Sequence, residues 1–450
     1  MHKLASKLKF YLSILTAKVL SILIAMLHRS SGTSFVGLVV LKICPKFLSY
    51  CSKYVKKEII TITGTNGKTT TAGLLASILE NNGQKIIHNE KGANMLTGIA
   101  NVLALGILPF KRFDYFVLES DEAYLTKLYD YLPSDYLLVT NLFRDQLDRY
   151  GELDTTAKKI QEAIDKNVNL KLLLNADDPM VANLGTEREK IYFGFDKVEI
   201  ASNAMVSHSP AENASCPECK EALKYADRFF AQQGHYYCDC GYHRPQCEYT
   251  GDVKIFENYS ILKVSSAKGD FEFNFGLIGL YNAYNALAAI AMGLELGYEQ
   301  AQIQNALNSY QAIFGRAERL IMQGHQVLVQ LIKNPTGASE VLKTVDLSSN
   351  ILIMINDNYA DGRDVSWLWD ADFEFLKDAK NPITVSGFRA NDMAVRLKYA
   401  GVDPTRIVVI PKIRHAIEHL LTTLDINEKL TILPTYTALL KMQTLRNKYI

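Results

Sequence analysis

The chain lacks an excess of charge of either sign. Its 49 basic and 48 acidic residues give a formal net charge of +1, so no overall field attracts nucleic acid or an acidic polymer. It also lacks internal repeats and low-complexity tracts, which excludes a repeat array. What is present is the composition of a globular protein, 48% hydrophobic and 22% charged, and 450 residues predict two or three domains.

Cysteine is scarce, with seven residues, an odd number. A disulfide framework is not expected in a chain of this length without a secretory signal, so we predict metal binding and a cytoplasmic location. Four of the cysteines form one tight cluster: Cys216, Cys219, Cys238 and Cys240.

A long apolar run occurs near the N-terminus, from Phe10 to Leu27, after Lys3, Lys7 and Lys9. It is similar to a signal peptide or a membrane anchor, but Lys18 interrupts it and no small-residue cleavage site follows. We expect a helix packed on the body of the protein. An amphipathic helix on the inner face of the membrane and a true span are the alternatives.

Short apolar runs alternate with helix-length segments, which predicts an α/β protein built on parallel sheets. The predicted strands are residues 58–63, 115–120, 136–141, 170–176 and 271–275, then 327–332, 351–356, 382–387, 406–411 and 430–435. A segment at 201–250 lacks this rhythm, and an alanine-rich helix is predicted at 282–296. The predicted divisions are an N-terminal helical segment (1–50), a central domain (51–318) with an inserted module (about 205–250), and a Rossmann-like C-terminal domain (319–450).

The strongest motif is ITGTNGKTTT, residues 62–71, between a predicted strand and a predicted helix. Its glycines let the backbone approach a phosphate, and the amides at the helix start point at the anion. Lys68 is expected to neutralise the end phosphates of ATP, and the Thr69 hydroxyl to bind Mg²⁺. The loop is shorter than a Walker A loop, because Ile62 stands where its first glycine would be. The predicted nucleotide contacts are Gly64, Thr65, Asn66, Gly67, Lys68, Thr69 and Thr70.

This loop resembles the ATP loop of the Mur ligases and folylpolyglutamate synthases. Further pieces agree in order: TNLFRDQLDRYG from Thr140, LLNADDP from Leu173, GLYNAYNALAA from Gly279 and GRAE from Gly315. The resemblance implies that Asn282 and Asn285, with Asn285 preferred, lie near adenine and that Arg316 faces the γ-phosphate. These roles suit the residues, since an amide both donates and accepts hydrogen bonds and a guanidinium forks onto phosphate oxygens.

Magnesium binding is predicted at a second residue as well. Glu119 ends the predicted strand 115–120 and is placed to bind Mg²⁺ beside Thr69, the alternative being a solvent-facing acid. The sequence departs from the family at Gln146, where typical Mur ligases have a histidine that helps to hold a second metal. Because an amide is a weaker ligand than imidazole, the second metal site stays open.

The cysteine cluster has the pattern of a structural zinc site. CPEC (216–219) and YYCDCGYHRP (236–245) place two pairs of thiolates with eighteen residues between them. Four thiolates close a tetrahedral Zn²⁺ site, and so small a module lacks the core to fold unaided. Cys247 is an alternative ligand, because the second pair has the narrower CxC spacing. A nucleic-acid-binding ribbon is disfavoured, since the module has no basic stripe.

An inserted zinc ribbon in such a chain resembles the MurT branch of the Mur ligase family, from about residue 30 to 440. IIHNEKGANM (86–95), NPTGASE (334–340) and the acidic segment 356–373 belong to this resemblance. It implies amidation of the D-glutamate α-carboxyl of lipid II through an acyl phosphate, with ammonia from a GatD-like glutaminase subunit in a heterodimer. Cys44, Cys51 and Cys247 lack the glycine turn of a glutaminase nucleophile, which independently favours a separate source of ammonia.

Three residues are predicted to be catalytic. Lys68 and Arg316 would spread the charge of the γ-phosphate. By resemblance Asp364, in DGRD, completes the glutaminase's Cys–His pair, with Asp361 as second choice; otherwise this loop is a solvated acidic turn. Two other functions stay open, namely a single-chain ligase that joins an amino acid and a nucleotide-dependent binding module without catalysis.

Overall fold

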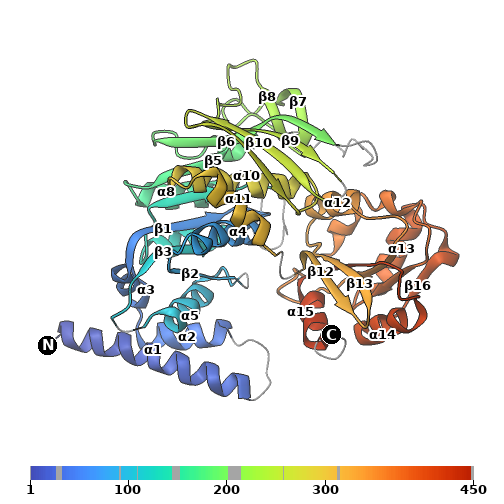
Figure 1. The fold of residues 1–450 in the computed structure, drawn as a ribbon, viewed down its shortest axis with the longest axis horizontal. Helices are drawn as coiled ribbons and strands as arrows, with labels where there is room; N and C mark the ends of the chain where they lie inside the picture. The colour runs from blue at the N-terminus through green and yellow to red at the C-terminus, as the bar shows by residue number, and fades with distance from the viewer. Residues whose placement is uncertain are drawn as a thin grey trace.

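The computed structural model describes residues 2–26, 33–90, 93–108, 110–143, 153–200, 214–256, 258–311 and 315–446. Figure 1 shows a large central sheet, with α1 and α2 along one edge of the molecule and a second α/β body beside it. The predicted α/β fold built on parallel sheets is confirmed.

The larger sheet has nine strands in the order β11-β10-β9-β6-β5-β4-β1-β3-β2. Neighbours from β9 to β2 pair in parallel, whereas β10 and β11 are antiparallel. The sequence pattern did not predict this antiparallel edge, whose strands alternate between buried and exposed residues. The strands are β1 (Val55–Thr63), β2 (Ile86–His88), β3 (Phe113–Glu119), β4 (Tyr136–Val139), β5 (Lys171–Asn175), β6 (Lys190–Ile200), β9 (Tyr249–Ile255), β10 (Ser260–Ser266) and β11 (Gly269–Phe275).

Helices cover both faces of this sheet, which explains why its central strands are almost continuously apolar. Ile60 and Ile62 of β1 belong to the core beneath α4, α10 and α11, whereas Ile59 belongs to the core on the opposite face. The helices of this body are α4 (Lys68–Asn81), α5 (Leu96–Gly106), α6 (Glu122–Tyr129), α8 (Leu153–Lys166), α9 (Pro179–Ala182), α10 (Leu280–Glu295) and α11 (Gln300–Ser309).

The second sheet has the order β12-β13-β17-β14-β15-β16 and is parallel except for the β12–β13 hairpin. Its strands are β12 (Arg316–Met322), β13 (His325–Gln330), β14 (Asn350–Met354), β15 (Ile383–Ser386), β16 (Ile407–Val409) and β17 (Leu430–Pro434). It is accompanied by α12 (Pro335–Lys343), α13 (Ala390–Tyr399), α14 (Ile413–Thr423), α15 (Tyr436–Arg446) and the short helices η2 (Ser366–Trp369), η3 (Phe373–Leu376) and η4 (Pro404–Arg406).

Two further pieces are attached to the nine-stranded sheet. The antiparallel hairpin of β7 (Lys224–Phe230) and β8 (Gln233–Tyr237) carries the cysteine cluster and is inserted between β6 and β9. The N-terminal helices α1 (His2–Met26), α2 (Thr33–Ile43) and α3 (Phe47–Cys51), with the short helix η1 (Ser52–Tyr54), cover the outer side of α5. Among the described residues, Ser6–Met26 of α1 is long and apolar enough to cross a membrane, and α2 with the chain up to Tyr54 passes the same test as one bent pair.

Candidate active site

Two glycines shape the loop between β1 and α4. Gly64 has a φ of 127° and Gly67 a φ of 85°, both in the region that favours glycine. Neither has room for a side chain, because a Cβ on Gly64 would lie 2.3 Å from Thr140 Oγ1 and one on Gly67 would lie 2.0 Å from Asn285 Oδ1. Backbone conformation and space therefore both require glycine at these positions.

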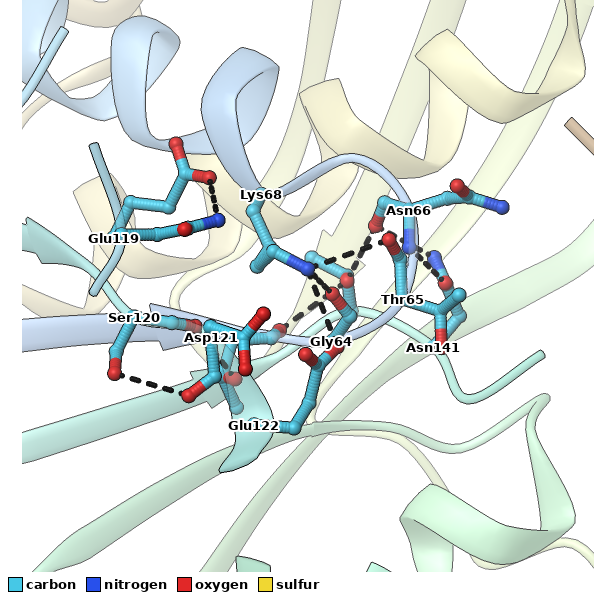
Figure 2. Close-up of polar contacts among 12 residues, drawn as sticks. Gly64, Thr65, Asn66, Lys68, Glu119, Ser120, Asp121, Glu122 and Asn141 are labelled. Carbon is cyan, nitrogen blue, oxygen red and sulfur yellow. Dashed lines mark hydrogen bonds and ion pairs between the residues drawn. The ribbon is translucent and has the colours of Figure 1, made fainter. Parts of the chain in front are cut away.

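The residues that follow β4 hold this loop in place. Thr65 N donates to Asn141 O at 2.9 Å, and Asn66 N donates to Asn141 Oδ1 at 2.8 Å. Thr140 Oγ1 donates to Asn66 O at 2.7 Å. Figure 2 shows Asn141 lying beside Thr65 and Asn66. The first two residues of the TNLFRDQLDRYG segment, which is part of the family resemblance, therefore brace the phosphate loop.

Lys68 begins α4, and its ammonium points into the loop (Figure 2). The buried Nζ donates to the carbonyl oxygens of Gly64 and of Thr65, and it pairs with Glu122 Oε1 at 3.2 Å. Burial raises the pKa of Glu122, while the Lys68 charge opposes this rise. The loop thus holds a cation where the helix start would meet an anion.

Thr69 and Glu119 place two oxygen ligands side by side. Glu119 Oε2 accepts a hydrogen bond from Thr69 Oγ1 at 2.5 Å, and Glu119 Oε1 accepts one from Asn94 Nδ2 at 3.2 Å. The buried Asn89 fixes the backbone of Glu119, accepting from its N at 2.7 Å and donating to its O at 2.8 Å. A hydroxyl and a carboxylate are the hard oxygen donors that Mg²⁺ prefers, so these residues fit that ion.

The two asparagines of α10 lie next to the phosphate loop. Asn285 Oδ1 accepts from Thr71 Oγ1 at 3.4 Å, and Asn285 Nδ2 donates to Asn282 Oδ1 at 3.3 Å. Asn282 Nδ2 donates in turn to Ile278 O at 2.8 Å. Both side chains are buried, as is that of Thr70 in the first turn of α4. The structure therefore brings these predicted nucleotide contacts together.

Two of the residues weighed from the sequence are not described at side-chain level. Arg316 is the first residue of β12 and pairs with Gln330, but its side chain lies outside the described part of the structure. Gln146, the departure from the family pattern, falls wholly outside the described residues.

Two residues between β13 and α12, Lys333 and Asn334, reach the phosphate loop. Lys333 Nζ donates to Thr65 O at 3.1 Å. Asn334 exchanges two hydrogen bonds with the side chain of Asn66, at 3.1 and 3.4 Å, and its Oδ1 also accepts from Gly337 N as the N-cap of α12. The start of α12 therefore faces the start of α4 across one loop. The NPTG segment supplied a signal for Asn334, but none pointed to Lys333.

The four clustered cysteines have the geometry of one metal centre. Their Sγ atoms all lie within 4.8 Å of one another, with 3.6 Å between Cys216 and Cys240 and 3.4 Å between Cys219 and Cys238. A tetrahedron of Zn–S bonds near 2.3 Å needs sulfur atoms about 3.8 Å apart, so the residues fit zinc. Cys247 is not part of this group, and burial raises its pKa.

A buried carboxylate joins the cysteine module to the sheet. Asp177 Oδ1 accepts from Arg244 Nε at 2.6 Å, and its Oδ2 accepts from Tyr284 OH and Phe195 N, each at 2.8 Å. Tyr284 lies on α10 between the two asparagines near the loop. Gln232 of the module also donates to the carbonyl of Leu142, next to the segment that braces the loop, at 2.5 Å. The module therefore supports two sides of the site.

In the acidic segment 356–373, some carboxylates form contacts within the fold and others are exposed to solvent. Asp361 is buried and accepts from Thr437 N at 2.7 Å and from Asn358 N at 3.1 Å, and burial raises its pKa. Asp357 forms an ion pair with Arg389 at 2.7 Å. Asp364 is exposed, and its Oδ1 accepts from Ser366 N at 2.8 Å. Asp364 is therefore exposed to solvent, whereas Asp361 is held within the fold.

Glu122 and Asn89 are further site residues that sequence reasoning missed. Glu122 lies three residues after Glu119, at the start of α6, and Asn89 directly follows β2. Both residues lie just beyond the carboxyl end of a parallel strand, which is where ligands bind in open α/β sheets. A search for polar residues at these positions could have found them.

Comparisons with known proteins show which family the chain is similar to. A family model described as the Mur ligase middle domain matches residues 62–293, and one described as MurT ligase C-terminal matches residues 331–439. The chain is 35% identical over 447 residues to lipid II isoglutaminyl synthase (glutamine-hydrolyzing) subunit MurT of Streptococcus pneumoniae, covering 97% of each chain. It is 34% identical over 416 residues to the protein of that name in Staphylococcus aureus (strain COL), covering 91% of this chain and 92% of the relative. Its fold is similar to that of a pseudomurein peptide ligase type C from Methanothermus fervidus, with a TM-score of 0.67, 22% identity, and coverage of 89% and 80%.

Proposed function

Because this chain belongs to the MurT family of Mur ligases, we propose that it catalyses the ATP-dependent amidation of the D-glutamate α-carboxyl in lipid II. The observation that carries this proposal is the meeting of two cations at one phosphate loop. Lys68 comes from the nine-stranded body and Lys333 from the six-stranded one, and both contact the carbonyl of Thr65. Two ammonium groups offset the negative charge that builds up when a phosphoryl group approaches a carboxylate.

The nucleotide would bind along the loop and the start of α4. Residues 64–70 supply the backbone amides and the Lys68 charge for its phosphates, and Asn285 and Asn282 offer donors and acceptors for the purine. Arg316 is assigned to the γ-phosphate by resemblance to the family. The Mur ligase family implies ATP and Mg²⁺; Thr69 and Glu119 would hold this ion, which supplies a further positive charge at the phosphates.

The reaction follows from these charges. A substrate carboxylate oxygen attacks the γ-phosphorus, the bond to the bridging oxygen breaks, and ADP leaves as an acyl phosphate forms. Ammonia then adds to the acyl carbon, and the tetrahedral intermediate expels phosphate and loses a proton to give the amide. The acyl phosphate must be kept from water, and the Asn66–Asn334 hydrogen bonds hold the two bodies together beside it.

Ammonia would come from a second subunit. Burial raises the pKa of Cys44, of Cys51 and of Cys247, and the other four of the seven cysteines belong to the metal cluster. A nucleophilic cysteine needs a lowered pKa or an adjacent base, so these thiols do not suit a glutaminase. The word subunit in the names of the relatives implies a complex, and a GatD-like glutaminase is the partner we propose.

Asp364 is the residue proposed to act on that partner. Its exposed carboxylate can accept a hydrogen bond from an imidazole and so orient the histidine of a Cys–His pair. Structural Zn²⁺ on the four cysteines would stabilise the inserted module, and α1 is proposed to contact the inner face of the membrane.

The test uses the complex purified from cells that express both subunits. We expect ADP formation with Mg²⁺, a muropeptide containing D-glutamate and either glutamine or ammonium chloride. Asp364→Asn should abolish the glutamine-dependent rate and leave the ammonium-dependent rate unchanged, while Asp370→Asn, another exposed acid of the segment, should change neither. Dependence on a free amino acid would instead indicate a single-chain ligase. Absence of ADP under every condition would reject catalysis.

A further inference from the structure

Helix α1 has two apolar faces, and only one is used by the fold. Phe10 stacks on Phe47 with 5.0 Å between ring centroids, and Ile14 and Ala17 are buried on the same side. The other side exposes large apolar side chains at helical spacing: Leu8, Tyr11, Leu12, Leu15, Val19, Ile22, Leu23 and Met26. Their exposed fractions run from 42% to 71%, so this row is open to solvent from Leu8 to Met26. A contiguous apolar surface of this extent marks an interaction site.

The charge around this row has one sign. Residues 1–57 contain nine lysines and one arginine and neither aspartate nor glutamate, although the whole chain has a net charge of only +1. Lys7 and Lys9 are exposed, and each stands next to Leu8 in sequence, roughly 100° around the helix on either side of the apolar row. Lysines in such positions can lay their stems on an apolar layer and keep their charges in the polar zone above it.

Helix α2 also exposes apolar and basic side chains. Phe35 and Leu38 are 57% and 43% exposed, and Lys42 is exposed one turn further along. Helices α1 and α2 pack against each other, and Figure 1 shows α1 along the outermost edge of the molecule. Apolar and basic side chains thus share one end of the protein.

From these observations we propose that α1 lies in the plane of an anionic lipid bilayer, with its exposed row in the acyl boundary and its lysines among the headgroups. A transmembrane orientation is disfavoured, since it would strip α1 from Phe47, Val36 and Val40 and carry Lys18 into the hydrocarbon. A second copy of the chain is a poorer occupant, because it would bring two basic surfaces together. Membrane binding by α1 is inferred from the exposed side chains alone. That this binding brings the site to a lipid-linked acceptor rests on the proposed function.

The binding test is flotation of the full-length protein with vesicles. We expect binding to vesicles of equal phosphatidylglycerol and phosphatidylcholine, and at least tenfold weaker binding to pure phosphatidylcholine or in 0.5 M NaCl. Leu15→Asp with Val19→Asp should weaken binding to the mixed vesicles more than tenfold. Val168→Asp places one such charge at a side chain that is 73% exposed on the nine-stranded body, and it should bind like the unaltered protein.

Three outcomes would overturn the proposal. The first is unchanged binding of the double variant. The second is a dimer in lipid-free buffer that this variant converts to a monomer, which would assign the face to a second copy. The third is resistance of the cellular protein to alkaline carbonate, which would indicate a span. The double variant should also keep its rate of ADP formation with a soluble muropeptide and lose rate only with a vesicle-borne acceptor. If no acceptor gives ADP, the proposed function fails while the vesicle result stands.

Discussion

Replacement of Gly67 by alanine tests the geometry on which the site depends. Two costs are expected. An alanine at a φ of 85° costs roughly 1–2 kcal/mol in backbone energy. Its Cβ would also lie 2.0 Å from Asn285 Oδ1, more than an ångström inside van der Waals contact, so either the loop or the asparagine must move. Because displacements of about 1 Å near a reacting group can cost about a hundredfold in rate, we expect kcat/KM for ATP to fall roughly 10- to 100-fold.

Gly83 is the matched control, since it lies just beyond the other end of α4. It has a φ of 74°, but a Cβ there would meet nothing within 4 Å. Gly83→Ala should therefore lower the urea midpoint through the backbone cost alone and leave the kinetics of ADP release unchanged.

A double variant tests whether the steric clash with Asn285 causes the loss of activity in Gly67→Ala. Asn285→Ala removes the atom that the new Cβ meets, so Gly67→Ala should cost much less catalytically in that background than in the unaltered protein. The expected crowding is refuted if Gly67→Ala keeps its kcat/KM for ATP within twofold of the Gly83→Ala value, or if the catalytic losses of Gly67→Ala and Asn285→Ala simply add.

The remaining predictions concern the second cation, the buried acid and the metal. Lys333→Ala should lower kcat/KM for ATP roughly 10- to 100-fold, the value of one charge-assisted contact, whereas the exposed Lys377→Ala should not; ADP release measures both. The buried acid is Asp178, which caps the start of α9 and accepts a hydrogen bond from Leu142 N at 2.9 Å. Burial raises its pKa to about 6, above the ordinary value of 3.8, so the stability that it contributes is fully present below pH 4 and is lost as the pH rises through 6. Between pH 4 and 7 the titration of Asp178 should lower the free energy of unfolding by about 3 kcal/mol, and Asp178→Asn should remove this decrease. Urea denaturation at a series of pH values measures it, and a variant whose stability still decreases by that amount would contradict the prediction. Cys216→Ser should lose bound zinc in elemental analysis and unfold at lower temperature, while Cys247→Ser should retain the metal.

The local sequence pattern predicted many of the strands and helices. Each apolar run that predicted a strand forms one within a few residues, and the alanine-rich helix begins at Leu280. The glycine loop lies between a strand and a helix as its motif requires, because φ > 0 and close approach restrict which residues can stand there. The cysteine spacing likewise led to a cluster, since two short turns suffice to aim four thiols inward. The roles of Asn282, Asn285, Arg316 and Asp364 stay predictions.

The sequence by itself indicated many of the strands, the phosphate loop and the cysteine knuckles, because each depends on residues close together in the chain. Only the tertiary structure decided that Glu122 pairs with Lys68, that Asp177 joins Arg244 to Tyr284, and that Lys333 reaches Thr65. These contacts join residues far apart in the chain, and no periodicity specifies which distant side chains will meet. The two faces of α1 show the same limit. Hydropathy marks the whole helix as apolar, and only packing determines which side remains exposed.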